Sequence, residues 1–389
     1  MTSKFRQKLR KIKLLQALAS LRITCLGIFL LFLLTLWGTI AQVQSGLYLA
    51  QERFFHSFYF LVLGFIPFPG GQLVMWILFI NVLAVMLICF VYSWKNFGIL
   101  VIHIGLLMFF VSGYVILNTA EESHVTLKEG QATNVSSAFH DWELAIWEAP
   151  PERTDGKVIR TVTGVDVARL KINQPLPMED SGIIIKLLEY HRNANAYAVN
   201  DGDSRYLNAS GVQKIEAAKL EKEPERNTPG IILEVTTPEG SSHVILYGAE
   251  RIPTPIEAGG KTYHLSLRLK RYPMPFTLKL VEFIKEEHPG TQTARSFKSK
   301  VAVDTGGQWR EKPITMNNPL RHREYTFYQS SFSVDQFRNE SSTLAVVRNH
   351  GRVLPYISTF VTFAGLVIHF AMAAVNTRKR QRQGAPHAK

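Results

Sequence analysis

Residues Gly98 to Leu117, GILVIHIGLLMFFVSGYVIL, form a run of 20 residues that carries no formal charge. At a rise of about 1.5 Å per residue, a helix of this length spans a hydrocarbon core of roughly 30 Å. The run contains one histidine, His103. Because an ionisable side chain inside a membrane span is costly, such a residue is a functional-site candidate by default.

Three further apolar runs predict additional membrane-spanning helices. They extend over Ile23–Ile40, Leu73–Tyr92 and Tyr356–Val375. Only residues 93–97 separate the second run from the stretch that contains His103, and so short a connection predicts an antiparallel helical hairpin. The aromatic-rich stretch 54–68 is too short and too broken to cross, and we expect it at the level of the lipid headgroups.

The charge distribution predicts how the spans are oriented. The chain has 389 residues and a net charge of +13, but residues 1–22 and 376–389 carry nearly all of the excess. The rest is almost neutral, so no nucleic-acid-binding face is expected. Basic residues accumulate on the cytoplasmic side of membrane spans. Both termini and the Lys95 turn are therefore expected in the cytoplasm, and residues 118–355 outside it, in the periplasm of a Gram-negative cell.

The outer segment has the patterns of a β-rich domain. Ile231–Thr236 and Ser242–Tyr247 are two β-prone runs joined by a turn sequence, which predicts a hairpin. Tyr263–Lys270 alternates apolar and polar residues, as a strand with one buried face does. Helical periodicity is confined to Val212–Lys222. Further strands are predicted at Gly182–Leu188, Thr277–Phe283, Lys300–Asp304, Glu324–Ser333 and Thr343–Arg348.

These patterns predict an α+β membrane protein with four transmembrane helices and a large extracytoplasmic β-rich domain between the third and the fourth. The predicted parts are a basic cytoplasmic N-terminus (1–22), three helices with an interfacial segment (23–117), the outer domain (118–355), the fourth helix (356–375) and a basic cytoplasmic tail (376–389). The expected location is the cytoplasmic, or inner, membrane.

Several kinds of chemistry find no support in the sequence. Both cysteines, Cys25 and Cys89, lie inside apolar runs, so neither a disulfide in the outer domain nor a Cys-based metal site is expected. The outer histidines occur singly, without the spacing of a zinc site. No catalytic triad, phosphate loop or carboxylate pair is recognisable. An enzyme that acts alone is therefore not expected. A transporter is also disfavoured, because the spans hold no acid or arginine.

Four segments of the outer domain carry a family resemblance. They are PMPFTLKL at 273–280, FKS at 297–299, MNNPL at 316–320 and YTFYQSSF at 325–332. Their order and spacing, followed by a final span, resemble the ResB family of cytochrome c biogenesis proteins. The three N-terminal spans and the LKEG stretch at 127–130 are similar to that family too.

The resemblance implies a role in system II cytochrome c biogenesis. Members convey haem across the membrane and help to present it to the Cys-X-X-Cys-His motifs of apocytochrome c, as one half of a haem lyase. The other half is a membrane protein of the CcsA or ResC type, which contributes a tryptophan-rich haem-handling loop. The six tryptophans of this chain form no such cluster. We therefore expect a lyase subunit that is not catalytic alone, with that protein, apocytochrome c and the lipid bilayer as partners.

The resemblance also implies that a histidine in the third span ligates intramembrane haem b, and His103 occupies that span. Neutral imidazole is a good axial ligand for haem iron. A second histidine, His369, lies six residues before the end of the fourth predicted span, whereas His103 lies five residues after the start of the third. At about 1.5 Å per residue, both are expected roughly 8 to 9 Å from the cytoplasmic edge.

Three arrangements of these histidines remain open from the sequence. His103 and His369 could bind one haem within the chain, or His103 could pair with a histidine of the partner. In the third, neither binds haem and each bonds to a neighbouring helix. At the outer ends of the two spans, His124 and His350 are candidates for contact with departing haem. The alternative function is a haem-free, membrane-anchored assembly or chaperone factor for apocytochrome c or the partner subunit.

Overall fold

A computed structural model describes residues 11–148, 162–178, 181–198, 205–288, 290, 294–334 and 340–384. The chain divides into two compact units. The helical unit comprises Met1–Glu121 and Arg348–Lys389, and the outer unit comprises Glu122–Val347. Of the two basic termini predicted from the sequence, residues 1–10 and 385–389 lie outside the described residues.

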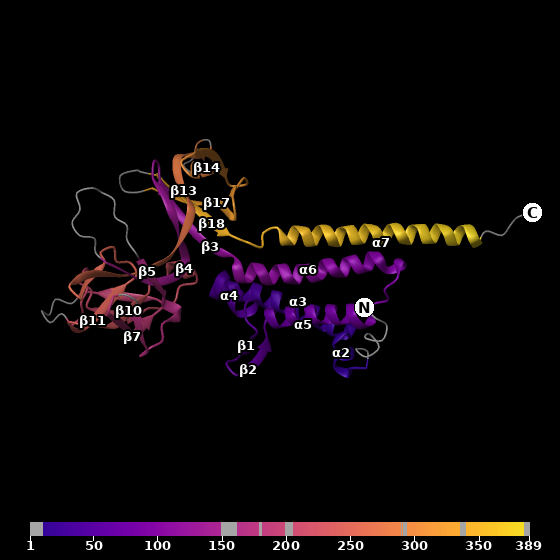
Figure 1. Cartoon of the computed structure of the whole chain (residues 1–389), viewed down its shortest axis with the longest axis horizontal. Coiled ribbons are helices and arrows are strands. Elements are labelled where there is room, and N and C mark those ends of the chain that lie inside the picture. The colour runs from indigo at the N-terminus through magenta and orange to yellow at the C-terminus, as the bar shows by residue number, and fades with distance from the viewer. Residues whose placement is uncertain are drawn as a thin grey trace, which may run out of the picture. The chain divides into compact units, whose positions relative to one another are not determined.

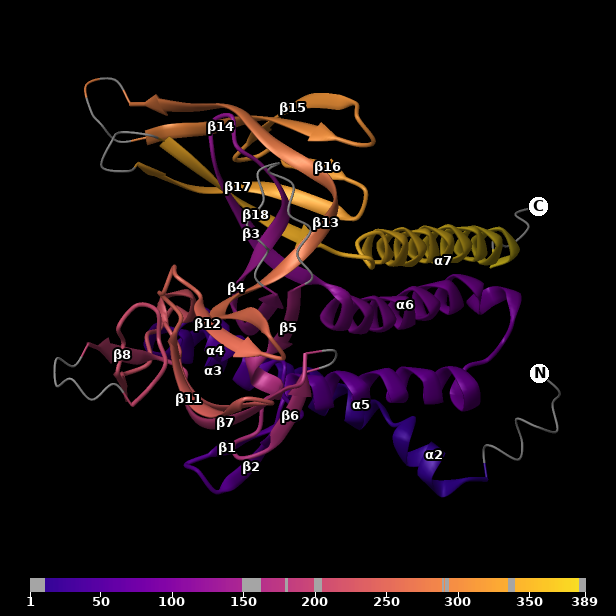
Figure 2. The ribbon, with the colours of Figure 1, turned by 60° about the vertical axis from the view of Figure 1, so that its left-hand side comes forward.

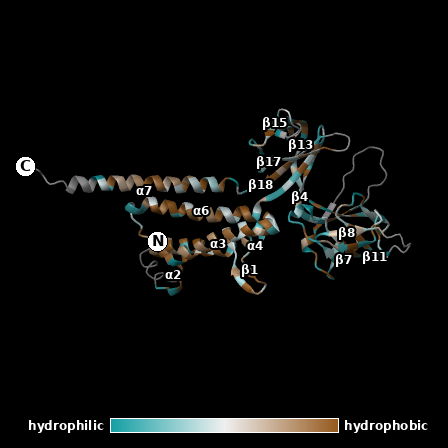
Figure 3. Ribbon diagram, turned by 180° about the vertical axis from the view of Figure 1, so that it is seen from behind, coloured by the Kyte–Doolittle hydropathy of each residue, from teal (hydrophilic) through white to brown (hydrophobic). Residues whose placement is uncertain are grey.

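The four predicted apolar helices are confirmed. They are α3 (Leu21–Ser45), α5 (Gly71–Ala84), α6 (Phe97–Thr119) and α7 (Leu354–Gly384). A π-helical turn, η1 (Val85–Cys89), extends α5, and a short 3-10 helix, η2 (Trp94–Asn96), precedes α6. All four helices are long and apolar enough to cross a membrane, and Figure 3 colours their residues by hydropathy.

The aromatic stretch after the first span folds back on the helices. Two short helices, α2 (Lys13–Leu18) and α4 (Leu47–Phe54), flank α3, and a hairpin of β1 (Tyr59–Val62) and β2 (Ile66–Pro69) follows them. Trp37 of α3 contacts the rings of Phe54, Phe60 and Phe68, with centroids 5.5, 5.7 and 5.8 Å away. Aromatic packing therefore holds the stretch predicted for the membrane interface against the first span.

Helices α6 and α7 lie side by side (Figure 1) and pack through small residues. Gly98, Gly105 and Ser112 are the buried residues of α6, and they recur at seven-residue intervals that keep them on one face. Opposite them, Ser358 and Gly365 of α7 are also buried. Small side chains let two helix backbones approach closely, which is the usual way that helices associate in a membrane.

The outer unit contains a large sheet and a smaller one. The ten-stranded sheet has the order β15-β14-β13-β4-β3-β18-β17-β16, with β12 added to β13 and β5 added to β4. Its strands are β3 (Glu121–Lys128), β4 (Ala132–Glu148), β5 (Val162–Asp166), β12 (Thr254–Ala258), β13 (Lys261–Glu287), β14 (Ala294–Asp304), β15 (Trp309–Thr315), β16 (Leu320–His322), β17 (Tyr325–Val334) and β18 (Glu340–Arg348).

The four-stranded sheet has the order β11-β10-β7-β6. Its strands are β6 (Pro175–Met178), β7 (Ile183–His191), β10 (Gly230–Thr237) and β11 (Gly240–Tyr247). A separate pair is formed by β8 (Ala194–Tyr197) and β9 (Lys214–Ala217), and two 3-10 turns complete the unit, η3 (Val167–Arg169) and η4 (Pro224–Arg226). The predicted β-rich character and the β10–β11 hairpin are confirmed.

Strand β13 is long (Figure 2) and contributes to two of the hydrophobic clusters of the outer unit, a first core against the four-stranded sheet and a second core within the large sheet. Its first half buries Leu265 and Leu267 against the four-stranded sheet, as the predicted alternation requires, and its second half buries Met274 and Phe276 in the other core. Between the halves, the register against β4 shifts after Pro273. Because proline has no amide hydrogen to donate, the PMPF segment marks the place where strand pairing is interrupted.

The predicted helical periodicity at Val212–Lys222 is wrong. Lys214–Ala217 forms strand β9, which pairs with β8. Ile215 is buried against Ile232 and Ile245 from the small sheet. The pairing with β8 and the burial of Ile215 stabilise a strand here. These tertiary contacts override the weak helical periodicity of the local sequence.

A buried polar network crosses the second core. The Ser299 hydroxyl donates to Oε1 of Gln329 at 2.6 Å, and Nε2 of Gln329 donates to the Ser342 hydroxyl at 3.0 Å. The two serine hydroxyls are 2.8 Å apart, so the Ser342 hydroxyl donates to that of Ser299. The three residues come from β14, β17 and β18. Because such a network is satisfied only in one arrangement, it favours one pairing of these strands.

We expect Ser299→Ala to lower the free energy of unfolding by about 1–3 kcal/mol, because buried polar atoms of Gln329 and Ser342 lose their partner. A thermal unfolding scan of the detergent-solubilised chain measures the change. The control is Ser333→Ala at an exposed position of β17, which should stay within about 0.5 kcal/mol of the wild type. Equal destabilisation by both variants would contradict a specific role for the network.

Candidate functional site

The side chain of His103 is held in one tautomer by its own helix. Its Nδ1 atom lies 2.8 Å from the carbonyl oxygen of Ile99, one turn earlier in α6. A carbonyl oxygen can only accept a hydrogen bond, so Nδ1 carries the proton and Nε2 keeps its lone pair. Histidines that bind metals usually donate their other ring N–H to a backbone carbonyl, a carboxylate or water, which fixes the ring and raises its basicity.

The surroundings of His103 are apolar. The ring of Phe90 has its centroid 6.1 Å from that of His103, and Phe90 is itself buried. Apart from His103, helix α6 carries no ionisable Asp, Glu, Lys or Arg over Phe97–Thr119. Among the described residues, no group of three or more His, Cys, Asp or Glu could hold a metal ion by itself. An axial position of haem iron needs a single nitrogen ligand from this chain, and ligation by His103 stays a prediction.

His369 lies on the face of α7 that packs against α6. A Cβ atom added at Gly98 would be 2.6 Å from the Cα atom of His369, so these two positions are level with each other. His103 follows Gly98 by five residues, which turns it by about 140° and moves it by about 7.5 Å along the helix axis. The Cα positions of the two histidines are thus offset along α6 and turned apart, and whether both bind one haem stays a prediction.

The two histidines predicted near the outer ends of the spans differ in exposure. The His124 ring on β3 lies 5.1 Å from that of Phe139, between centroids, and burial lowers the pKa of His124 below its usual 6.5. Its Nδ1 is buried without a hydrogen-bond partner among the described residues. His350, between β18 and α7, is exposed. Contact of either residue with haem stays a prediction.

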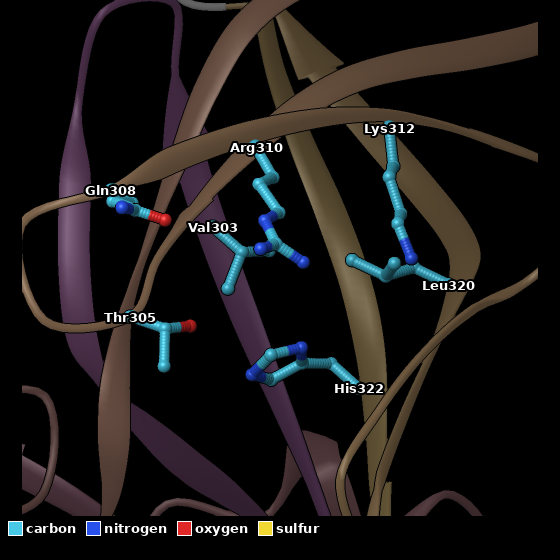
Figure 4. Close-up of a pocket in the computed structure, with 7 residues that line it drawn as sticks. All are labelled: Val303, Thr305, Gln308, Arg310, Lys312, Leu320 and His322. Carbon is cyan, nitrogen blue, oxygen red and sulfur yellow. The ribbon is translucent and has the colours of Figure 1, made fainter.

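A second candidate site was not expected from the sequence. Seven residues of the outer unit line a cavity of about 200 Å³ between β14, β15 and β16 (Figure 4). They are Val303, Thr305, Gln308, Arg310, Lys312, Leu320 and His322. The only local signal was the alternation of Gln308, Arg310 and Lys312, which reads equally well as an exposed strand face.

The fold defines a class: a protein with four helices long and apolar enough to cross a membrane, a histidine in the third of them that bonds to its own helix, and a large β-rich domain in the chain between the third and fourth. Residues 254–349 match the model of the ResB-like family. The matched segment runs from β12 to the end of β18 and contains the PMPF, MNNPL and YQSSF motifs.

A curated relative is consistent with this match. The chain is 30% identical over 97 residues to Protein NrfI of Wolinella succinogenes, an alignment that covers 24% of this chain and 10% of that protein. Both findings support a ResB-like assignment of the outer-domain segment around residues 254–349. The four helices lie outside the segment that the family model matches.

Proposed function

We propose that this chain conveys haem across the membrane and helps to present it to apocytochrome c, as one half of a system II haem lyase. The ResB-like match and the similarity to NrfI support a role in cytochrome c biogenesis. The observation that carries the haem part is the Nδ1 hydrogen bond of His103 to Ile99, which leaves Nε2 as a ligand atom in an apolar setting. In this scheme the termini are cytoplasmic and the outer unit is extracytoplasmic, periplasmic in a Gram-negative cell.

Haem b is the substrate of this reaction, and His103 would hold its iron through one axial position. His369 faces α6 at the level of Gly98, which favours a second ligand from the partner subunit over one from this chain. The partner would be the haem-handling membrane protein of the CcsA or ResC type. Covalent attachment to the Cys-X-X-Cys-His motif would take place in the assembled pair.

The test is to purify the chain in detergent after expression with and without that partner, and to record oxidised and reduced absorption spectra. The proposal predicts a six-coordinate haem signature when the two are co-expressed. A complex that forms but contains no haem would contradict the proposal and favour the haem-free assembly or chaperone factor. Covalent haem on a co-expressed apocytochrome c is the second readout.

A further inference from the structure

The cavity in the outer unit has the chemistry of an anion site. None of its seven lining residues is acidic, and Arg310, Lys312 and His322 bring three nitrogen groups to it (Figure 4). Within the part of the chain that the structure describes, neither Arg310 nor Lys312 forms an ion pair. The neighbouring Glu311 is bound by Lys300, with Nζ and Oε2 2.7 Å apart, and is not a lining residue.

The two cations lie on the core-side face of β15, but because β15 is an edge strand both residues are themselves exposed. Arg310 is paired with Val303 and Lys312 with Val301 across the β14–β15 ladder, and directly paired residues lie on the same face. Both valines are buried in the second core. Inward-pointing charges on an edge strand can serve to block aggregation, but such a role requires no cavity beside them.

His322 provides an unmatched polar atom in the same place. Its Nε2 is buried and has no hydrogen-bond partner among the described residues. The Phe276 ring, with its centroid 4.7 Å away, contacts the imidazole edge to face. Burial, followed by the positive charges of Arg323, Lys312 and Arg310, lowers the pKa of His322 below 6.5. A neutral imidazole can donate one hydrogen bond to an incoming anion.

The local sequence explains why these groups meet. The turn after β15 is closed by backbone bonds between Thr315 and Asn318, at 3.1 and 3.2 Å. It leads directly into β16, where Leu320 is buried in the core and His322 faces the cavity. The MNNPL motif thus positions the third nitrogen group of the site.

We propose that this cavity binds a carboxylate group of a small ligand. The planar fork of Arg310 matches the two oxygens of a carboxylate, and Lys312 adds a point charge. Val303 and Leu320 provide an apolar wall for the carbon chain next to the carboxylate. If the proposed function holds, one source is a propionate of the haem that has crossed the membrane, and a free dicarboxylate is the other.

The experiment uses the full chain in detergent and three carboxylate probes. These are succinate, iron-free protoporphyrin IX, and the dimethyl ester of the same porphyrin as a control without carboxylates. Succinate binding is followed by calorimetry and porphyrin binding by fluorescence. Iron-free porphyrin has no iron for His103 to ligate. Absence of carboxylate binding at the cavity therefore does not change the result of the haem spectroscopy, and absence of a haem spectrum does not change the result of the carboxylate-binding test.

We expect the acid porphyrin or succinate to bind to the wild type, and the ester to bind at least about tenfold more weakly than the acid porphyrin, as expected when a charged hydrogen bond is lost. Arg310→Gln and Lys312→Gln should each weaken carboxylate binding by a similar factor. Arg310→Lys, which keeps the charge but not the fork, should also weaken it. Lys298→Gln, an exposed position on the same hairpin but outside the cavity, is the matched control and should bind as the wild type does.

Three outcomes would overturn the proposal. The first is equal binding of the acid and ester porphyrins without succinate binding. The second is unchanged carboxylate binding in an Arg310→Gln variant that has the same melting temperature as the wild type. In that case the charges on β15 would serve only to protect the edge strand against aggregation. The third is tighter binding of inorganic phosphate than of either carboxylate, in competition at the same site.

Discussion

His103→Ala is expected to abolish the six-coordinate haem spectrum of the chain co-purified with its partner. Loss of a group that only orients a metal ligand costs about 10–100-fold in metal affinity, and loss of the ligand itself should cost at least as much. The readouts are haem content per chain and the oxidised and reduced absorption spectra. We expect the protein to remain folded, because the hydrogen bond that the structure shows for the His103 ring is to its own helix.

Two controls separate ligation from a structural effect. Exogenous imidazole should restore the spectrum of His103→Ala, because it can supply the missing nitrogen. His369→Ala should retain the six-coordinate spectrum, since its backbone packs against Gly98 and not beside His103. Loss of the spectrum in His369→Ala would instead indicate ligation by both histidines of this chain. An unchanged spectrum in both variants would remove the intramembrane ligand hypothesis.

Gly105→Leu is expected to separate α6 from α7. A Cβ atom at Gly105 would contact the Thr362 hydroxyl and lie 2.8 Å from the Thr362 backbone nitrogen, which cannot move away as a flexible side chain could. Overpacking typically costs about 1–3 kcal/mol and sometimes more. We therefore expect a lower apparent melting temperature and less folded protein in the membrane fraction.

The matched control for this variant lies on the same helix. Gly113 is exposed, and a Cβ atom there would meet nothing within 4 Å. Gly113→Leu should therefore leave the stability of the isolated chain unchanged. If the two leucine variants were equally stable, close packing of α6 and α7 through their small residues would not be what holds these helices together.

Much of the fold is encoded locally and could be predicted. A span needs a continuous apolar run of sufficient length, so the helices around His103 and His369 were recognised without tertiary information. The alternation around Leu265 similarly predicted a half-buried strand, because side chains alternate across a sheet. Val212–Lys222 failed because a short segment with few apolar residues has no pattern strong enough to resist a tertiary contact.

The candidate sites were only partly predictable, because local sequence does not specify how residues from different elements are oriented toward one another. Sequence placed His103 in an apolar run long enough to span a membrane, but not on a particular side of α6 relative to His369. That side depends on which face of α6 carries Gly98 and Gly105 against α7. The outer cavity was missed entirely, because its cations come from β15 whereas its imidazole comes from β16.

The sequence by itself therefore determined the four apolar helices and the β-rich character of the chain between the third and fourth, since hydrophobic length and period are local properties. Only the tertiary structure decided that β3 lies between β4 and β18, that Ser299 meets Gln329 and Ser342, and that Arg310 and His322 share one cavity. These are pairings between distant segments. They are selected by register, packing and hydrogen-bond satisfaction across the whole sheet, which no single stretch of sequence contains.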